Sequence, residues 1–108
     1  MSGLIQVSIT VGSQSEGQRI VDALLRDRLI ACGQVFGPIR SSYWWQGKIE
    51  TSEEWMCLAK SREENFAEIV RSVQEMHSYE VPEIIAVPLV ASDEKYAQWV
   101  EAEVNKPL

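Results

Sequence analysis

The fold is decided by residues 5–16, IQVSITVGSQSE, where a strand-like pattern gives way to a helix start. Apolar and polar residues alternate from Ile5 to Val11, a period of two that is typical of a β-strand with one apolar face. Ser13 and Glu16 then have the spacing of a capping box, in which each side chain satisfies a free backbone N–H at the start of a helix. The stretch therefore predicts a strand followed at once by a helix.

The segments after this stretch predict a long hairpin. The first helix, whose apolar residues form one stripe, is expected to end near Leu29. A strand then begins near Ala31 and returns, after a tight turn at Gln46-Gly47, as far as Ala59. Pro38 has no backbone N–H, so it predicts an edge or a bulge in this hairpin.

The last third of the chain predicts a helix, a strand and another helix. A second capping box at Ser61 and Glu64 precedes a helix that runs to His77. The almost continuous apolar run over residues 83–90 predicts a strand that is covered on both faces or lies in the middle of the sheet. Ser92 is expected to cap the last helix. The apolar positions of that helix are Tyr96, Trp99, Val100 and Val104.

The order of these elements, β-α-β-β-α-β-α, predicts an α+β fold. Its first six elements match the ferredoxin-like split βαβ fold, in which two helices cover one face of an antiparallel sheet. The last helix is then an addition at the C-terminal end. With 108 residues, 45% of them apolar, the chain has the size and composition for one hydrophobic core. We therefore expect a single domain over residues 1–108.

The net charge of −6 argues against several classes of partner. The ten basic residues are scattered and form no cluster of the kind that binds nucleic acid or an anionic membrane surface. The longest uncharged apolar run is interrupted by Pro88, so no segment is expected to span a bilayer. No export signal is recognisable, and we expect a cytoplasmic protein in which Cys32 and Cys57 are free thiols.

The single histidine, His77, limits the chemistry that the chain can perform. A cysteine enzyme would need it beside Cys32 or Cys57, but neither cysteine lies in a nucleophile motif. Small buried side chains are the simpler interpretation of both cysteines. We therefore expect no catalytic residues and no enzyme activity.

One cluster has the residue types of a cation site. His77, Glu80 and Glu83 lie close together in the sequence and could supply one imidazole and two carboxylates to a metal ion. Pro82 breaks any helix here, so the spacing does not place the three on one face. The alternative is that His77 ends a helix, where positive charge suits the helix dipole, and that both glutamates lie on the surface.

Three aromatic residues in a row, Tyr43, Trp44 and Trp45, fall on the predicted hairpin. Alternation sends Tyr43 and Trp45 to one face and Trp44 to the other. Such bulk suits a contact between subunits, where aromatic residues are enriched, and it suits packing in the core equally well.

Three motifs in this order resemble the CutA family of divalent-cation tolerance proteins. They are Ala31-Cys32, the hairpin segment SYWWQGKIE at residues 42–50, and HSYEVPEIIAVP at residues 77–88. The stretch from Tyr96 to Val100 also fits the Tyr-x-x-Trp ending of that family. The resemblance covers roughly residues 4–104.

This resemblance implies a compact homotrimer of ferredoxin-like subunits joined through the long hairpins, similar in architecture to the PII-type signalling proteins. It also implies a role in the response to divalent metal ions, with copper as a candidate ion. Where copper ligands of the family are described, they include a first-strand Cys and a His-His pair, and this chain has Ile9 and Met76-His77 in the matching positions. Two other departures are Gly33, where the family often has Asn, and Ser78, which replaces a Pro.

The residues and the resemblance together predict a homotrimer that binds a cation or a small ligand at the boundary between subunits. The alternative is a structural or PII-like signalling trimer without metal binding. The cation is expected to meet His77, Glu80 and Glu83. The surrounding ligand cleft is predicted to contain Cys32, Trp45, Lys48, Lys60 and Tyr79.

Overall fold

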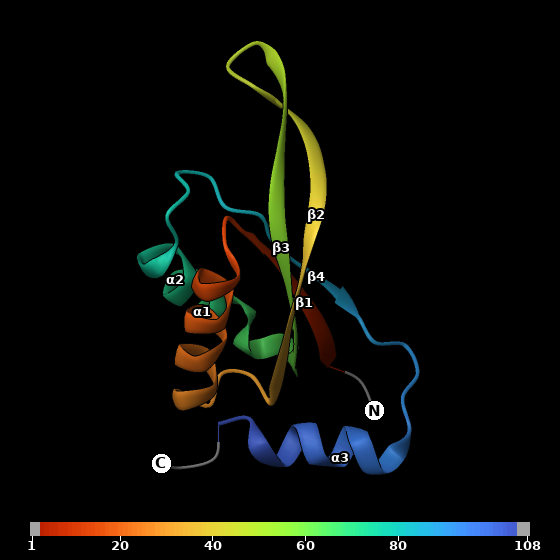
Figure 1. Ribbon diagram of the computed structural model, residues 1–108. Coiled ribbons are helices and arrows are strands. Elements are labelled where there is room, and N and C mark those ends of the chain that lie inside the picture. The colour runs from red at the N-terminus through yellow and green to blue at the C-terminus, as the bar shows by residue number, and fades with distance from the viewer. Residues whose placement is uncertain (1–2, 106–108) are drawn as a thin grey trace.

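The computed structural model describes residues 3–105 as four strands and three α-helices around one sheet (Figure 1). The elements are β1 (Leu4–Val11), α1 (Gln14–Arg26), β2 (Cys32–Trp45), β3 (Lys48–Arg62), the short 3-10 helix η1 (Glu63–Asn65), α2 (Phe66–Met76), β4 (Ile84–Pro88) and α3 (Glu94–Glu103). Neighbouring strands are antiparallel, in the order β2-β3-β1-β4. This topology confirms the expected α+β, ferredoxin-like fold with an added C-terminal helix.

The core lies between the sheet and helices α1 and α2, which lie on the same side of it in Figure 1. Strand β1 is central because β3 pairs with one of its edges and β4 with the other. Val7, Ile9 and Val11 are fully buried, as the alternation in the sequence predicts. They form one cluster with the buried apolar residues of both helices, which are Ile20, Val21, Leu24, Ile69 and Val73.

Helix α3 packs in a second, smaller cluster. Ala97 and Val100 of α3 contact Leu4 at the start of β1. Tyr96 and Trp99, which we expected among the apolar positions of this helix, are 38% and 41% exposed. That expectation was wrong because the contact with the sheet is made by the smaller side chains, which leaves the rings outside it.

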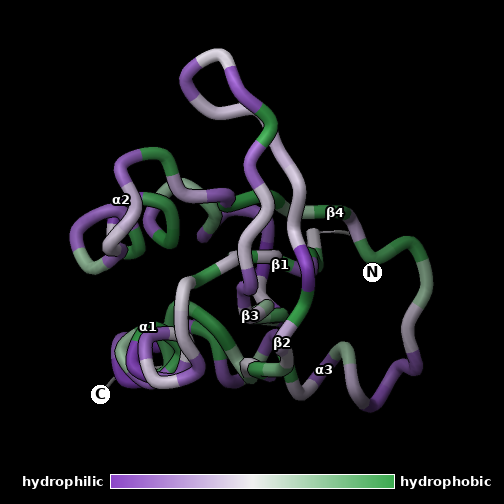
Figure 2. Tube along the Cα trace, turned by 45° about the horizontal axis from the view of Figure 1, so that its top comes forward, coloured by the Kyte–Doolittle hydropathy of each residue, from purple (hydrophilic) through white to green (hydrophobic). Residues whose placement is uncertain are grey.

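The hairpin of β2 and β3 projects beyond the rest of the chain as a long arm (Figure 1). Figure 2 shows that hydrophilic and hydrophobic residues both lie near its tip. The register shifts between Phe36 and Ile39, so Pro38 lies in a bulge of the edge strand β2, as expected. The regular pairing of β2 with β3 is therefore interrupted where the sequence places a residue without a backbone N–H.

The aromatic side chains of the arm are not part of the core. Tyr43, Trp44 and Trp45 are 41%, 72% and 40% exposed in the single chain. The core-packing interpretation of these residues is therefore wrong for the chain by itself, because the arm extends past both helices (Figure 1).

Strand β4 lies at an edge of the sheet, which contradicts the expectation of a central or doubly covered strand. Ile84 and Ala86 pack against the core, whereas Ile85 and Val87 are about half exposed. An apolar run shows that a strand is apolar on both faces, but it does not show what covers its second face.

Two expected helix starts were also wrong. Ser61 is a residue of β3, and its hydroxyl donates to the carbonyl oxygen of Leu29 at 2.6 Å, because pairing with β1 carries the strand as far as Arg62. Helix α2 instead starts after η1, without a side-chain cap. At α3 the cap is Asp93 and not Ser92, since Oδ2 of Asp93 accepts from the backbone N–H of Tyr96 at 3.0 Å.

The close approach of α1 to β2 depends on the absence of a side chain at Gly33. A Cβ atom at this position would lie 2.6 Å from Cγ1 of Val21, which is buried and cannot move aside. Gly33→Ala should therefore lower the free energy of unfolding by about 1–3 kcal/mol. Denaturant unfolding at a fixed protein concentration measures this change.

A double-mutant cycle with Val21→Ala separates this clash from a change in backbone freedom. The smaller side chain at position 21 makes room, so Gly33→Ala should cost less in the Val21→Ala background than in the native one. Equal costs in both backgrounds would show that the contact with Val21 is not the cause.

Candidate functional site

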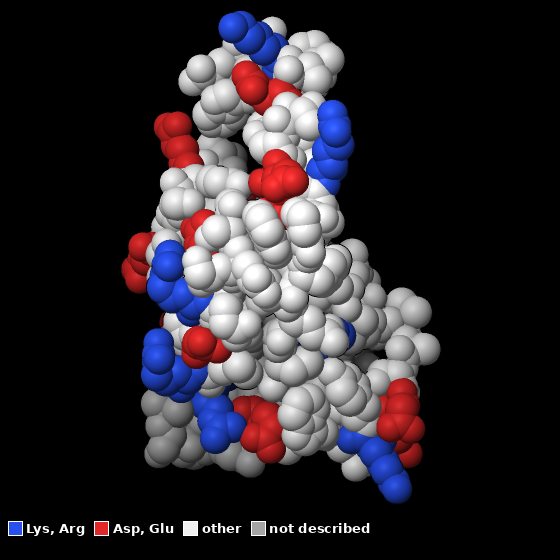
Figure 3. All heavy atoms as spheres, viewed as in Figure 1, with Lys and Arg blue, Asp and Glu red and all other residues white. Residues whose placement is uncertain are grey.

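A cleft of about 640 Å³ lies between the arm and the segment that follows α2. Its walls come from β2, β3 and the loop before β4, and the end of β1 contributes Thr10. Figure 3 shows acidic side chains both on the arm and beside it. The residues that line the cleft are Thr10, Ser41, Ser42, Tyr43, Trp44, Trp45, Glu54, Tyr79, Glu80, Val81 and Glu83.

The register of the arm places two rings and a carboxylate on the same face. Tyr43 pairs with Glu50, Ile39 pairs with Glu54, and paired residues of antiparallel strands point to the same side. Every second residue shares a face, so Tyr43 and Trp45 point to the side of Glu54. Tyr43, Trp45 and Glu54 all line the cleft, and Ser42 and Trp44 from the alternate face of β2 line it as well.

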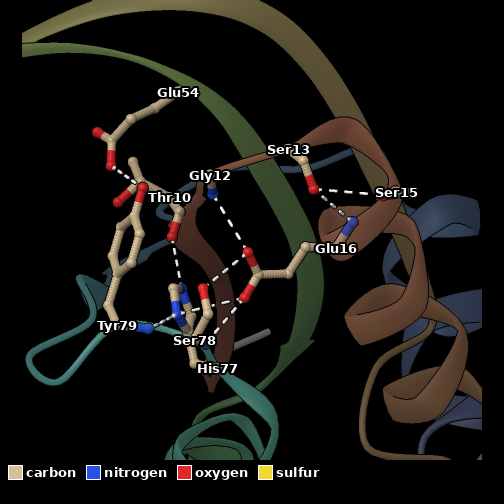
Figure 4. A network of polar contacts seen from close by, with 9 residues as sticks. All are labelled: Thr10, Gly12, Ser13, Ser15, Glu16, Glu54, His77, Ser78 and Tyr79. Carbon is tan, nitrogen blue, oxygen red and sulfur yellow. Dashed lines mark hydrogen bonds and ion pairs between the residues drawn. The ribbon is translucent and has the colours of Figure 1, made fainter.

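Tyr79 joins the opposite wall to the arm. Its hydroxyl donates to Oε2 of Glu54 at 2.8 Å (Figure 4), and Glu54 is only 7% exposed. Burial, together with the hydrogen bond to Glu54, raises the pKa of Tyr79, so the phenol keeps its proton and stays a donor. The hydrogen bond thus orients a carboxylate that is almost completely buried at the base of the arm.

The side chain of His77 is buried beneath the cleft and does not line it. Its Nδ1 accepts from the backbone N–H of Tyr79 at 3.0 Å, so the ring carries its proton on Nε2, which donates to the carbonyl oxygen of Thr10 at 2.7 Å. Both nitrogens are therefore occupied by backbone groups, and neither is free to bind a metal ion.

The expected trio of His77, Glu80 and Glu83 is consequently not assembled in the single chain. The loop brings Glu80 and Glu83 to the cleft but leaves His77 behind Thr10. Within residues 3–105 no group of three or more His, Cys, Asp or Glu residues could hold a metal ion. A cation site that uses His77 stays a prediction for the assembled protein, and it requires that one of these hydrogen bonds break.

The predicted ligand cleft is brought together only in part. Trp45 and Tyr79 line it, whereas Cys32 and Lys60 pair with each other at the far end of the hairpin, and Lys48 lies at the tip opposite Trp45. Antiparallel pairing brings Cys32 to Lys60 and keeps both far from the turn within one chain, so a cleft that contains all five residues stays a prediction for the boundary between subunits.

Both cysteines are free, as expected. The Cys32 thiol lies 3.3 Å from the Tyr96 hydroxyl. Cys57 is fully buried in the core, and burial, with a smaller effect of the Glu16 carboxylate, raises its pKa to about 11. A thiol with such a pKa is a poor nucleophile, because only the thiolate is reactive.

Glu16 has a role that the sequence analysis missed. Ser13 accepts from the Glu16 backbone N–H at 3.1 Å, which confirms the helix cap. The Glu16 carboxylate does not complete a capping box, however. It accepts from the Gly12 N–H at 3.3 Å, from the Ser78 N–H at 2.9 Å and from the Ser78 hydroxyl at 3.1 Å (Figure 4).

This buried carboxylate ties the start of α1 to the loop that carries Tyr79. Burial raises its pKa, but the hydrogen bonds from Ser78 and Gly12 outweigh burial, so the pKa of Glu16 is lower than usual. The only signal in the sequence was the spacing from Ser13, and that signal assigned Glu16 to its own helix. A contact 62 residues away has no local signature.

Comparisons with known proteins agree on one family. The family model described as "CutA1 divalent ion tolerance protein" matches residues 5–103. The divalent-cation tolerance protein CutA of Archaeoglobus fulgidus is 40% identical over 99 residues, which make up 92% of this chain and 96% of the relative. The crystal structure of CutA1 from Oryza sativa superimposes with a TM-score of 0.93 at 31% identity, over 97% of this chain and 96% of that one.

The compartment is not decided by these relatives. The rice protein "CutA 1, chloroplastic" is 34% identical over 97 residues, a match that spans 90% of this chain and 55% of that protein. No helix within residues 3–105 is both long enough and apolar enough to cross a membrane. The cytoplasmic location therefore stays a prediction.

Glu16→Gln tests the role of the buried carboxylate in stability. The amide NH₂ group of glutamine would face the N–H or O–H donors of Gly12 or Ser78, so at least one of the three hydrogen bonds is lost. We therefore expect the free energy of unfolding at pH 7 to fall by about 1–3 kcal/mol. Because the pKa of Glu16 is lowered on folding, its ionised carboxylate contributes fully to the free energy of unfolding above the ordinary pKa of 4.5. This contribution is lost as the pH falls through the pKa of the folded state. The difference between native and variant proteins should therefore shrink below about pH 4.5.

Denaturant unfolding between pH 3 and pH 7 measures this difference, and Glu75→Gln is the matched control because Glu75 is exposed on α2. Glu75→Gln should change stability by less than about 0.5 kcal/mol. A stability difference between the native protein and Glu16→Gln that stays constant over the whole pH range would contradict this role.

Proposed function

Since this chain belongs to the CutA1 divalent ion tolerance protein family, we propose that it is a homotrimer that binds a cation in the cleft beside the arm. One observation carries the binding proposal: the lining of the cleft includes the carboxylates of Glu54, Glu80 and Glu83 and no Lys, Arg or His residue. The net charge of −6 adds a diffuse attraction for cations. Binding rather than catalysis is the proposed activity, with a role in the response to metal ions in the cytoplasm.

The homotrimer proposal is supported by the apolar surface that the single chain leaves open. Phe36 and Ile49 of the arm are 48% and 65% exposed, and Ile85 and Val87 of the edge strand are 51% and 49% exposed. The sheet also has two edge strands, β2 and β4. Unpaired strand edges and exposed apolar side chains are typical of regions where another chain binds. Three copies related by one axis would cover the arm of each chain with a neighbour, which places the cleft near a subunit boundary.

The metal would meet mainly oxygen donors, because His77 is held by backbone hydrogen bonds. Carboxylate oxygens bind a copper ion less tightly than thiolate or imidazole ligands do, and Ile9 stands in the place of a first-strand thiol. We therefore propose weak divalent-metal binding. A signalling or scaffold trimer without metal binding is the second candidate, favoured by the absence of a three-ligand cluster within residues 3–105.

The proposed trimer depends on the exposed face of β4. Sedimentation of the native protein at micromolar concentration should give the mass of three chains. Ile85→Asp should lower the mass toward one chain, because it places a charge in an apolar interface. Leu25→Asp, on the outer surface of α1, is the control and should leave the mass unchanged. A native mass of one or two chains would rule out the trimer.

The proposed metal site depends on the two loop carboxylates. In a calorimetric titration with Cu²⁺ at pH 7.5, replacing both Glu80 and Glu83 by Gln should weaken binding by about tenfold or more, since affinity follows the number of charged ligands. Glu75→Gln removes the same kind of charge outside the cleft and should have little effect. An unchanged affinity in the double variant would exclude the cleft as the copper site, and a large loss in His77→Ala alone would show that His77 leaves its backbone partners on binding.

A further inference from the structure

The cleft combines aromatic walls with separated carboxylates. Tyr43 and Trp45 lie on one face of the arm, with Glu54 at its base, and Glu80 and Glu83 stand on the opposite wall. At about 640 Å³ the cleft is far larger than a metal ion and has the volume of a small-molecule site. A ligand that fills it has to satisfy negative charge and cover ring surface at the same time.

Glu54 is the group in the cleft that most requires a cationic partner. It is 93% buried, and its Oε2 is occupied by the Tyr79 hydroxyl at 2.8 Å. Its other oxygen, Oε1, has no hydrogen-bond partner among residues 3–105. Every fully buried side-chain oxygen within those residues does have a partner, so Oε1 is not fully buried. Oε1 is therefore open to the cleft, where a charged N–H donor can reach it.

The aromatic rings favour a different kind of cation from the one that oxygen ligands favour. A metal ion requires several donors within about 2–2.6 Å, and the described residues contain no such group of three. An ammonium group requires one or two carboxylates, and the faces of Tyr and Trp add cation–π attraction and cover the attached carbon atoms. Separated carboxylates on two walls also suit a ligand that is charged at both ends.

We propose that the cleft binds an organic ammonium cation, a small alkylamine whose charged group meets Glu54 and whose carbon chain lies against Tyr43 and Trp45. This inference rests on the proposed function, because it names the class of cation that the cleft prefers. Glu80 and Glu83 hold the second charge of a diamine at the opposite wall. Tyr79 acts as a positioning residue, since its hydroxyl fixes the Glu54 carboxylate while leaving Oε1 free.

The test is a calorimetric titration of the native protein with four probes at pH 7.5 and constant ionic strength. The probes are 1,4-diaminobutane, the uncharged isostere butane-1,4-diol, Mg²⁺ as a dication without carbon, and Cu²⁺. We expect the diamine to bind about tenfold or more tightly than both the diol and Mg²⁺, because only the diamine combines charge with apolar contact.

Two variants then place the diamine in the cleft. Glu54→Gln keeps the shape of the side chain and should weaken diamine binding by about tenfold. Trp45→Leu should also weaken it, while Glu75→Gln, which removes a charge from α2, should not. Sedimentation of each variant confirms that its assembly is the same as that of the native protein.

The outcomes distinguish this inference from the function on which it rests. One outcome is that the diamine binds no more tightly than the diol, while Cu²⁺ binds and the Glu80→Gln and Glu83→Gln changes abolish that binding. This outcome would overturn the inference and leave the proposed function standing. Failure of all the cations to bind would overturn both. Equal losses in Glu54→Gln and Glu75→Gln would show attraction to the acidic surface as a whole and would overturn the inference.

Discussion

The pairing of β1 on both of its edges is the constraint on which the rest of the structure depends. Strand β3 holds one edge and β4 the other, and the buried face of β1 forms the centre of the core. The same strand ends where the site begins. The carbonyl oxygen of Thr10 holds His77, and the N–H of Gly12 helps to hold Glu16. A change in the register of β1 would therefore disturb the core and the cleft together.

The cleft is held by polar groups that are buried behind it. Glu16 fixes Ser78, His77 joins Thr10 to Tyr79, and Tyr79 fixes Glu54. Buried charges and polar groups are costly unless each has a partner, and no buried side-chain nitrogen or oxygen within residues 3–105 lacks one. These contacts join the loop after α2 to β1, α1 and the arm, and this loop forms one wall of the cleft. Glu16, His77 and Ser78 thus hold the cleft in shape without lining it, whereas Thr10 and Tyr79 do both.

The arm and the edge strand β4 leave apolar side chains exposed in the single chain. Large apolar side chains on both are about half exposed or more, and the sheet ends in two unpaired edges. Tyr43, Trp44 and Trp45 line the cleft together with Glu54, Glu80 and Glu83, whereas Phe36 and Ile49 of the arm are exposed outside its lining. The same hairpin therefore both lines the cleft and exposes apolar side chains.

The sequence by itself determined the order of the elements, the buried face of β1, the cap at Ser13 and the bulge at Pro38. Each of these follows from periodicity, from a cap or from a missing N–H within a few residues. It also placed Glu80 and Glu83 near a site because they are carboxylates close to His77 in the sequence, and it added Trp45 and Tyr79 once the resemblance was considered. Glu54, an ordinary residue of a strand, carried no signal of its own.

Only the tertiary structure decided which of the candidate residues meet. It moved Cys32 and Lys60 to the far end of the hairpin, enclosed His77 between two backbone groups and gave Glu16 a partner 62 residues away. It also left β4 at an edge, although its sequence resembles that of a central strand. The physical reason is that local patterns fix the conformation of a segment and the face it buries, whereas the partner of a buried polar group depends on how distant segments pack.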